Sequence, residues 1–192
     1  MRIALRLIIL VVLQFVVLAS MIAVKQWTLS TGTPIVLETE PIDPRSLFQG
    51  DYVRLNYTIS SLRLAELPSD RPFKEHERIY VLLRNGDPYW EPVSLHHERP
   101  GLPPDHVTLK GTVIRAGNRR WNRQSQSWEA TEHLMVRYGI ENYFVPEGEG
   151  RDLERPKPGE KISICVAVDQ FGNGGIKAVL VNGQPRYTET LF

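Results

Sequence analysis

The octapeptide GDYVRLNY, residues 50–57, decides how this chain is expected to fold. Side chains along a β-strand point alternately to its two faces. One face of this segment and its continuation is apolar and consists of Val53, Leu55, Tyr57 and Ile59. The opposite face is polar and consists of Tyr52, Arg54, Asn56 and Thr58. The alternation predicts a strand with one face in a core, and therefore a sheet-based domain.

The segment before this strand predicts a tight turn. The proline that follows Asp43 disfavours helix at that residue, and Gly50 suits a left-handed backbone conformation. Asp51 begins the strand on its core side, where a carboxylate needs hydrogen-bond donors. Arg45, the backbone amides of the turn or the Tyr57 hydroxyl could supply them.

The polar residues of this region allow three interpretations. In the first, they form a structural corner in which Asp51 ties the turn, Arg45 pairs with Asp43 or Asp51, and the tyrosines pack. In the second, Asp51, Arg45 and Tyr52 form a polar binding site. In the third, Tyr52 and Arg54 form a partner-binding edge, because exposed tyrosine and arginine are good interface anchors.

Strand patterns dominate the rest of the chain. The expected strands are residues 34–40, 78–84, 89–97, 106–115, 134–144, 161–169 and 176–181. Asn-Gly pairs at 85–86 and 182–183 favour hairpin turns because both residue types tolerate positive φ. Many short strands separated by such turns predict a mainly-β domain, either a barrel or a distorted sandwich.

Three segments between the strands carry other patterns. Short helices are expected at residues 62–67 and 150–154. Residues 116–132 are rich in polar side chains and are expected to form a mobile flap or an extended hairpin.

The N-terminal end carries a long apolar segment. Residues 7–24 are interrupted only by Gln14 and Ser20, and about 18–20 helical residues cross the hydrocarbon of a bilayer. A cleaved signal peptide is the alternative interpretation. The apolar run is longer than the usual signal-peptide core and lacks a clean small-x-small cleavage site, so we expect an uncleaved signal-anchor.

The charges around this segment predict its orientation. Arg2 and Arg6 precede it, and only Lys25 follows it closely. This asymmetry favours an N-terminus in the cytoplasm and the remainder outside. We therefore expect a transmembrane anchor over residues 1–25 and one extracytoplasmic domain over residues 26–192.

Composition restricts the partners that the domain could have. The chain has 23 basic and 22 acidic residues, so its formal net charge is +1. No basic face points to nucleic acid. Cys165 is the only cysteine, which rules out an intrachain disulfide, and its apolar strand context predicts a core thiol and not a nucleophile.

Support for catalysis or metal binding is weak. Ser46 and Lys110 could be compared with the serine and lysine of bacterial signal peptidases, but the residues typical of that family around the serine are missing. A Ser–Lys pair also needs a buried lysine within reach of the hydroxyl.

The five histidines have no metal-ligand spacing. The acidic segment 147–154 lacks the alternating carboxylates of a calcium loop. We expect no metal and no cofactor.

A second aromatic segment contains one conspicuous carboxylate. Strand alternation places Glu141 on the opposite face from Tyr138 and Phe144. A carboxylate in such a strand is either paired or lies in a groove. We predict that Glu141 pairs with Arg45 or Arg54, which would join the two aromatic segments.

The octapeptide matches the string G-D-Y-x-x-L-x-Y at every specified position, and the chain resembles the bacterial GDYXXLXY family, which is named for that string. Residues 43–45 (DPR), 47–48 (LF) and 138–148 (YGIENYFVPEG) add to the resemblance. The resemblance implies a single-pass protein of the bacterial cytoplasmic membrane with an extracytoplasmic domain and no assigned activity. It also implies a partner, because members are often associated with an uncharacterised multi-pass membrane protein.

These observations favour a non-catalytic accessory or interaction module that assembles with a multi-pass membrane partner. The alternative is a domain that binds or hydrolyses cell-envelope material; its ligand is unknown, and its cleft would be lined by Asp51, Arg45 and Glu141. Gln14 and Ser20 could each hydrogen-bond a partner helix with about 0.6–2 kcal/mol. The candidate signature and binding residues are Asp43, Arg45, Gly50, Asp51, Tyr52, Arg54, Leu55, Tyr57 and Glu141.

Overall fold

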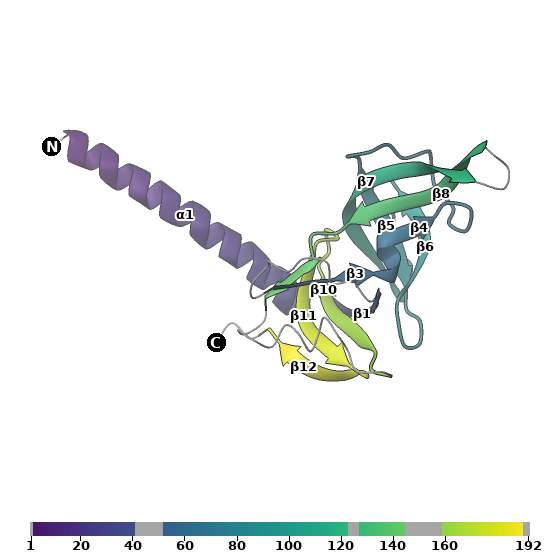
Figure 1. Cartoon of the computed structure of the whole chain (residues 1–192). Coiled ribbons are helices and arrows are strands. Elements are labelled where there is room, and N and C mark those ends of the chain that lie inside the picture. The colour runs from purple at the N-terminus through teal and green to yellow at the C-terminus, as the bar shows by residue number, and fades with distance from the viewer. Residues whose placement is uncertain (1, 41–51, 123–126, 145–158, 190–192) are drawn as a thin grey trace.

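A computed structural model describes residues 2–40, 52–122, 127–144 and 159–189 of the chain. One long helix, α1 (Arg2–Thr31), projects from a domain built almost entirely of antiparallel strands (Figure 1). The predicted fold class, a mainly-β domain after a single N-terminal apolar helix, is confirmed.

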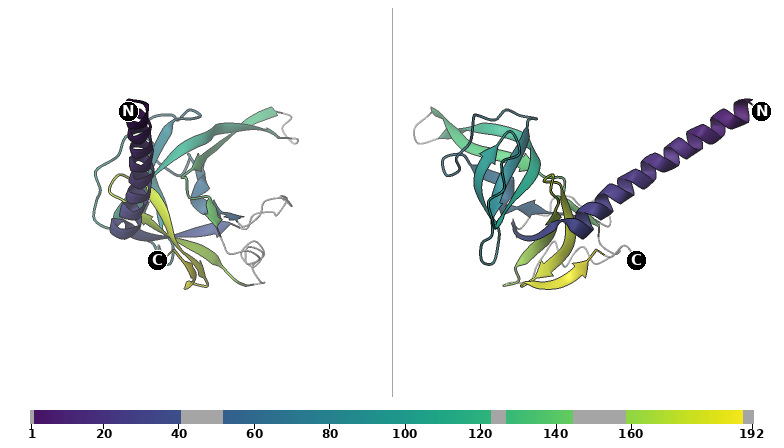
Figure 2. Two further views of the ribbon diagram at one scale, coloured as in Figure 1. Left: turned by 90° about the vertical axis from the view of Figure 1, so that its left-hand side faces the viewer. Right: turned by 180° about the vertical axis from the view of Figure 1, so that it is seen from behind.

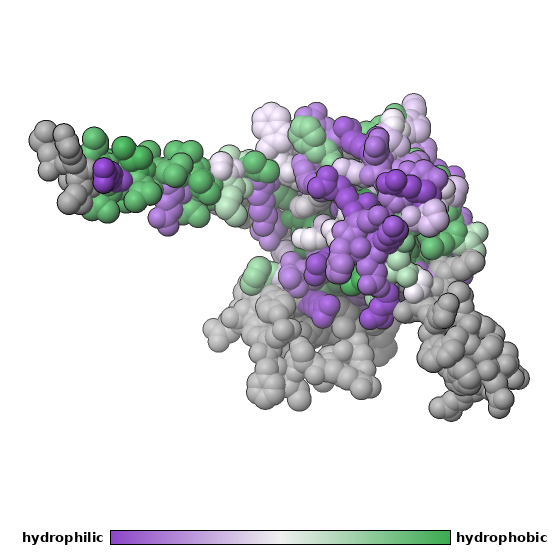
Figure 3. All heavy atoms as spheres, turned by 90° about the horizontal axis from the view of Figure 1, so that it is seen from above, coloured by the Kyte–Doolittle hydropathy of each residue, from purple (hydrophilic) through white to green (hydrophobic). Residues whose placement is uncertain are grey.

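Helix α1 is apolar over most of its length. The most apolar 18-residue window within Leu5–Thr31 has a mean hydropathy of 3.0, and none of that window is buried against the domain. In Figure 3 the helix is a mostly hydrophobic rod, whereas the visible face of the domain is largely hydrophilic. The helix is long and apolar enough to cross a bilayer.

The first sheet lies next to the helix. Its strand order is β12-β11-β10-β1-β3. Its strands are β1 (Thr33–Glu40), β3 (Asn56–Tyr57), β10 (Ile162–Val168), β11 (Gly174–Val181) and β12 (Gln184–Thr188). Ile35 pairs with Val166 in the register of β1 and β10, and both side chains are buried. The predicted Asn182-Gly183 turn joins β11 to β12, with φ of 51° and 78° at its two residues.

The second sheet has the strand order β4-β8-β7-β5-β6. Its strands are β4 (Ser61–Arg63), β5 (Arg78–Arg84), β6 (Glu91–His96), β7 (His106–Asn122) and β8 (Ser127–Arg137). The sheet is strongly curled (Figure 2), and register shifts after Val113 and Ala116 allow β7 to bend. The backbone of β7 and β8 confirms the extended hairpin in the region 116–132.

Two predicted strands are interrupted where the chain changes partner. The segment 51–59 divides into β2 (Tyr52–Arg54), β3 and the short 3-10 helix η1 (Thr58–Ser60). Strand β2 pairs with β9 (Asn142–Phe144), whereas β3 pairs with β1. The segment 134–144 likewise divides into β8 and β9. Each break lets one continuous segment contribute to two sheets.

The predicted helix at 62–67 is wrong. Residues Ser61–Arg63 form β4, in which Leu62 pairs with Leu134 of β8. Both leucine side chains are buried, so core packing overrides the local helix signal. The helix expected at 150–154 lies outside the described residues.

One core fills the space between the two sheets. Buried apolar side chains of both sheets belong to a single cluster. From the first sheet it includes Ile35, Leu37, Ile164 and Val166, and from the second Ile79, Val81, Leu109 and Leu134. Leu55, Tyr57 and Ile59 also belong to this cluster, which places the apolar face of this segment in the interior.

Candidate functional site

The signature segment and residues 138–144 lie against each other, as the two family-like segments were expected to do. In the β2–β9 pair, Val53 is opposite Tyr143. Immediately after β2, the Leu55 amide donates a hydrogen bond of 2.7 Å to the Glu141 carbonyl oxygen. We call this contact between 52–60 and 138–144 the signature crossing.

Two tyrosine hydroxyls form hydrogen bonds across the signature crossing, one in each direction. The Tyr57 hydroxyl donates to the Ile140 carbonyl oxygen at 2.6 Å, and the Tyr138 hydroxyl donates to the Ile59 carbonyl oxygen at 2.7 Å. Burial, reinforced by the negative charge of Glu141, raises the pKa of both hydroxyls well above the usual value for tyrosine. Both groups therefore stay protonated and act as hydrogen-bond donors that satisfy buried carbonyls.

Glu141 stabilises the turn that separates β8 from β9. Its carboxylate accepts hydrogen bonds from the backbone amides of Tyr138, at 2.5 Å, and Gly139, at 2.9 Å. Gly139 has a φ of +82°, a conformation that glycine adopts without Cβ strain. The carboxylate thus has backbone partners in place of the predicted Arg54, whose side chain is exposed. The other predicted partner, Arg45, lies outside the described residues.

The remaining predicted site residues divide into three groups. Leu55 and Tyr57 are buried members of the core, so these two signature positions are structural. For Tyr52 the structure describes only the backbone, which belongs to β2. Asp43, Arg45, Gly50 and Asp51 lie outside the described residues.

A second buried contact, which the sequence analysis did not identify, joins α1 to the domain. The Thr28 hydroxyl donates to Asp169 Oδ2 at 2.8 Å, and both residues are buried. Thr28 lies in the last turns of α1, and Asp169 follows β10 directly. We call this contact, together with the turn 169–173, the helix junction.

The Asp169 carboxylate organises the turn that follows β10. Its Oδ1 atom accepts hydrogen bonds of 2.9 Å from the amides of Phe171 and Asn173. The Asn173 side-chain amide donates to Oδ2 at 2.9 Å, and the Lys110 ammonium in turn donates to Asn173 Oδ1 at 2.6 Å. Burial alone would raise the pKa of Asp169, but hydrogen bonds from Asn173, Thr28 and Phe171 together hold it below its usual range.

Two glycines allow the helix to dock closely. A Cβ atom at Gly32 would lie 2.5 Å from the Thr28 carbonyl oxygen and 2.9 Å from the Val168 nitrogen. A Cβ atom at Gly175 would lie 3.0 Å from Leu29 Cδ2. The end of α1 therefore packs directly against the backbone of β10 and β11. The paired glycines 174–175 were the available sequence signal for this approach.

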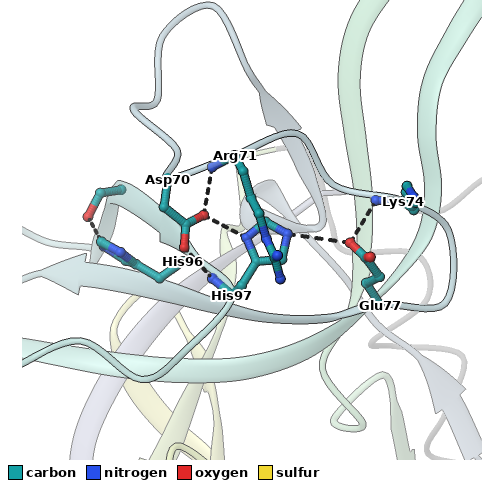
Figure 4. A network of polar contacts seen from close by, with 7 residues as sticks. Asp70, Arg71, Lys74, Glu77, His96 and His97 are labelled. Atoms are coloured by element: carbon teal, nitrogen blue, oxygen red, sulfur yellow. Dashed lines mark hydrogen bonds and ion pairs between the residues drawn. The ribbon is translucent and has the colours of Figure 1, made fainter.

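A polar cluster on the second sheet surrounds one buried histidine (Figure 4). The His97 side chain is 6% exposed, and its Nδ1 atom lies 2.6 Å from Asp70 Oδ1. Its Nε2 atom lies 3.4 Å from Glu77 Oε2. The Phe73 ring stacks on the imidazole, with ring centroids 3.9 Å apart. Asp70, Phe73 and Glu77 all come from the segment between β4 and β5, so the cluster fastens this segment to the end of β6.

The electrostatics of this cluster favour charged carboxylates. Partial burial opposes ionisation of Asp70, but hydrogen bonds and the charge of His97 lower the pKa of Asp70 to about 2. A hydrogen bond from the Lys74 amide, with smaller contributions from His97, lowers the pKa of Glu77. Within the described residues, no group of three or more His, Cys, Asp or Glu side chains could hold a metal ion. The contacts that the cluster makes are those of a structural clamp.

The Ser–Lys comparison finds no support at Lys110. The ammonium of Lys110 is engaged by Asn173 in the helix junction, where it acts as a hydrogen-bond donor. The serine of that comparison, Ser46, lies outside the described residues.

Comparison with known proteins identifies one family. The model of the GDYXXLXY protein family matches residues 14–179, which include most of α1, the signature crossing and the helix junction. No curated protein and no solved structure matches the chain. The match covers most of the sequence, and the chain therefore belongs to the GDYXXLXY protein family.

Proposed function

We propose that this protein is a membrane-anchored accessory module that assembles with a multi-pass membrane protein. In this proposal α1 spans the bacterial cytoplasmic membrane with its N-terminus in the cytoplasm, and the β domain lies on the outer side. The basic residues Arg2 and Arg6 support this orientation, because positive charge is retained on the cytoplasmic side.

The observation that carries the proposal is the Gln14 side chain. Gln14 lies near the middle of the apolar run 7–24, on the exposed surface of α1. In the described part of the chain its amide makes no hydrogen bond. A polar group in hydrocarbon has no water to bind, so it favours a partner inside the membrane. Another transmembrane helix can offer such a partner.

Ser20, the other polar residue of the run, differs from Gln14. Its hydroxyl donates to the Val17 carbonyl oxygen of the same helix at 2.7 Å. Ser20 is therefore satisfied within α1, as serine in membrane helices commonly is. This contrast supports Gln14, and not Ser20, as the proposed partner contact and makes Ser20 a matched control.

In this proposal the helix junction couples the position of the domain to that of α1. The last turns of α1 are fixed to β10 and β11 through Thr28, Asp169 and the two close glycine contacts. A partner helix that binds α1 therefore also sets the position of the domain. The domain would be held over the outer face of its partner, as an accessory subunit requires.

Co-purification from membranes in mild detergent tests this proposal. Tagged full-length protein is compared with Gln14→Leu and with Ser20→Ala, and the co-eluting chains are identified by mass spectrometry. We expect a multi-pass membrane protein in stoichiometric amounts with the wild type and Ser20→Ala, and at least tenfold less with Gln14→Leu. Recovery of the wild-type chain alone would contradict the partner, and full recovery with Gln14→Leu would contradict the assigned contact.

A further inference from the structure

We propose that the turn 169–173 rests on the surface of the bilayer and that the Phe171 ring enters the lipid headgroup region. The ligand is the membrane itself, contacted by the domain at a point separate from α1. This inference rests on the membrane span in the proposed function, but it does not depend on the protein partner.

The hydrogen bonds of the helix junction fix the position of the turn along α1. Asp169 accepts from the Thr28 hydroxyl at 2.8 Å through Oδ2 and from the Phe171 amide at 2.9 Å through Oδ1. The Phe171 backbone therefore lies within two hydrogen bonds of the helix at Thr28. The level of Phe171 relative to the bilayer follows from the level of Thr28.

The level of Thr28 follows from the apolar run. Thr28 is four residues beyond Val24, where the run ends, and four residues of helix rise about 6 Å. The headgroup region of each leaflet is about 5–8 Å thick, because a bilayer of about 40–45 Å encloses about 30 Å of hydrocarbon. With the hydrocarbon boundary near Val24, Thr28 and the turn bonded to it lie within or at the edge of the headgroup region.

The side chains at this level suit a membrane interface. Trp27, one residue before Thr28, is 59% exposed, and tryptophan is enriched at bilayer interfaces. Lys25 is exposed on the same stretch of helix and can extend its ammonium toward the headgroups. Phe171 is 57% exposed although it belongs to a turn whose backbone is fixed by the Asp169 carboxylate.

Backbone hydrogen bonds hold the turn that carries the exposed Phe171 ring. Asp169 holds the amides on both sides of Gly172, and the Lys110 amide of β7 donates to the Gly172 carbonyl oxygen at 2.8 Å. The turn is thus held to both α1 and β7. An exposed aromatic ring held near the level of Thr28 would add apolar surface on the domain to that of α1 at the bilayer interface.

Spin-label accessibility in full-length protein reconstituted into phosphatidylcholine–phosphatidylglycerol vesicles tests this inference. In a Cys165→Ala background, single labels are placed at Phe171→Cys, at Gln14→Cys and at Leu102→Cys. Gln14 reports the hydrocarbon, and Leu102, which is 46% exposed between β6 and β7, reports water. For each label, collision with oxygen, which concentrates in lipid, is compared with collision with a water-soluble nickel chelate.

The inference predicts that the oxygen-to-nickel ratio at position 171 lies between those at 14 and 102, and several-fold above that at 102. A ratio at 171 equal to that at 102, with a lipid-like ratio at 14, would overturn this inference alone. An aqueous ratio at position 14 would overturn the membrane span and with it the proposed function.

Two further results keep the test decisive. Circular dichroism of each labelled variant must match the wild type; Phe171 is exposed, so its replacement is expected to leave the fold intact. Protection of position 171 from both reagents would show a protein contact there and would overturn the assignment to lipid.

Discussion

The signature crossing and the helix junction join distant parts of the chain through buried hydrogen bonds, but their chemistry differs. In the signature crossing, neutral tyrosine hydroxyls donate to the carbonyls of Ile140 and Ile59. In the helix junction, the Asp169 carboxylate accepts hydrogen bonds from several donors, including the Thr28 hydroxyl. The first contact holds two sheets around one core, and the second holds the domain to α1.

The difference separates the family motif from the element that connects the domain to α1. Leu55 and Tyr57, which occupy two of the specified positions of the motif, are buried in the core. The contact that sets the position of the domain relative to α1 depends on Asp169, far from the motif in sequence. A motif that defines a family thus need not mark the surface through which its members act.

The largest effect is expected when the signature crossing loses a whole side chain. Tyr57 is fully buried, so Tyr57→Ala removes a large ring and leaves a cavity. We expect a loss of about 3–5 kcal/mol in the free energy of unfolding, measured by urea denaturation of the full-length protein in detergent. The control Tyr57→Phe removes only the hydroxyl and leaves the Ile140 carbonyl unsatisfied, which is expected to cost about 1–3 kcal/mol. Equal losses for both variants would contradict the packing role of the ring.

The helix junction is expected to respond to Asp169→Ala with an intermediate loss. The substitution leaves the Thr28 hydroxyl and the Phe171 and Asn173 amides without their charged acceptor. A hydrogen bond to a charged group contributes about 1.5–3 kcal/mol, so we expect Asp169→Ala to destabilise by at least that amount. Thr28→Val removes one donor only and should cost less. A Thr28→Val effect as large as that of Asp169→Ala would show that the helix contact, and not the turn, dominates.

The two contacts should also differ in their dependence on pH. The pKa of Asp169 is lower in the folded protein than in an unfolded chain, so its stabilisation is complete above the unfolded value and is lost as the pH falls below it. The cost of Asp169→Asn should therefore shrink between pH 7 and pH 3. Tyr57 and Tyr138 have raised pKa values and stay neutral over this range, so the cost of Tyr57→Phe should be constant. A pH-independent cost of Asp169→Asn would refute the charged character of the junction.

A smaller acid effect is expected from the His97 clamp. The pKa of Asp70 is lowered to about 2, so its contribution is present above about pH 4 and is lost as the pH falls toward 2. Asp70 is substantially exposed, and solvent screening reduces the energy of such pairs. The melting temperatures of wild type and Asp70→Asn should therefore differ by a small amount at pH values above about 4, and the difference should vanish near pH 2. Divergence that grows toward acid would be inconsistent with this sign.

The smallest effect is expected at Arg54. Its side chain is exposed, and the structure pairs Glu141 with backbone amides instead. Arg54→Ala should change the free energy of unfolding by less than about 0.5 kcal/mol. A larger loss of unfolding free energy in the same urea experiment would support the predicted Glu141–Arg54 ion pair.

Local patterns were sufficient to predict most of the elements. Hydropathy predicted α1, strand alternation predicted the buried positions of Leu55 and Tyr57, and the Asn182-Gly183 pair predicted its hairpin turn. Each of these features depends on neighbouring residues, which a sequence displays directly.

The features that were missed depend on distant partners. Strand 51–59 is interrupted because β2 and β3 pair with different strands, and Leu62 joins a strand because Leu134 lies opposite. The partners Thr28 and Asp169 are 141 residues apart in sequence. A single sequence shows that these residues are polar or apolar, but not which distant residue each one meets.

Amide hydrogen exchange tests whether α1 and the domain form one unit held by Asp169. The experiment compares full-length wild type with Asp169→Asn in lipid vesicles. We expect exchange at the Phe171, Asn173 and Gly32 amides to be at least tenfold faster in the variant than in the wild type. Exchange at the Leu55 amide of the signature crossing is expected to be unchanged. Unchanged exchange at all four amides, or equal acceleration at Leu55, would contradict this expectation.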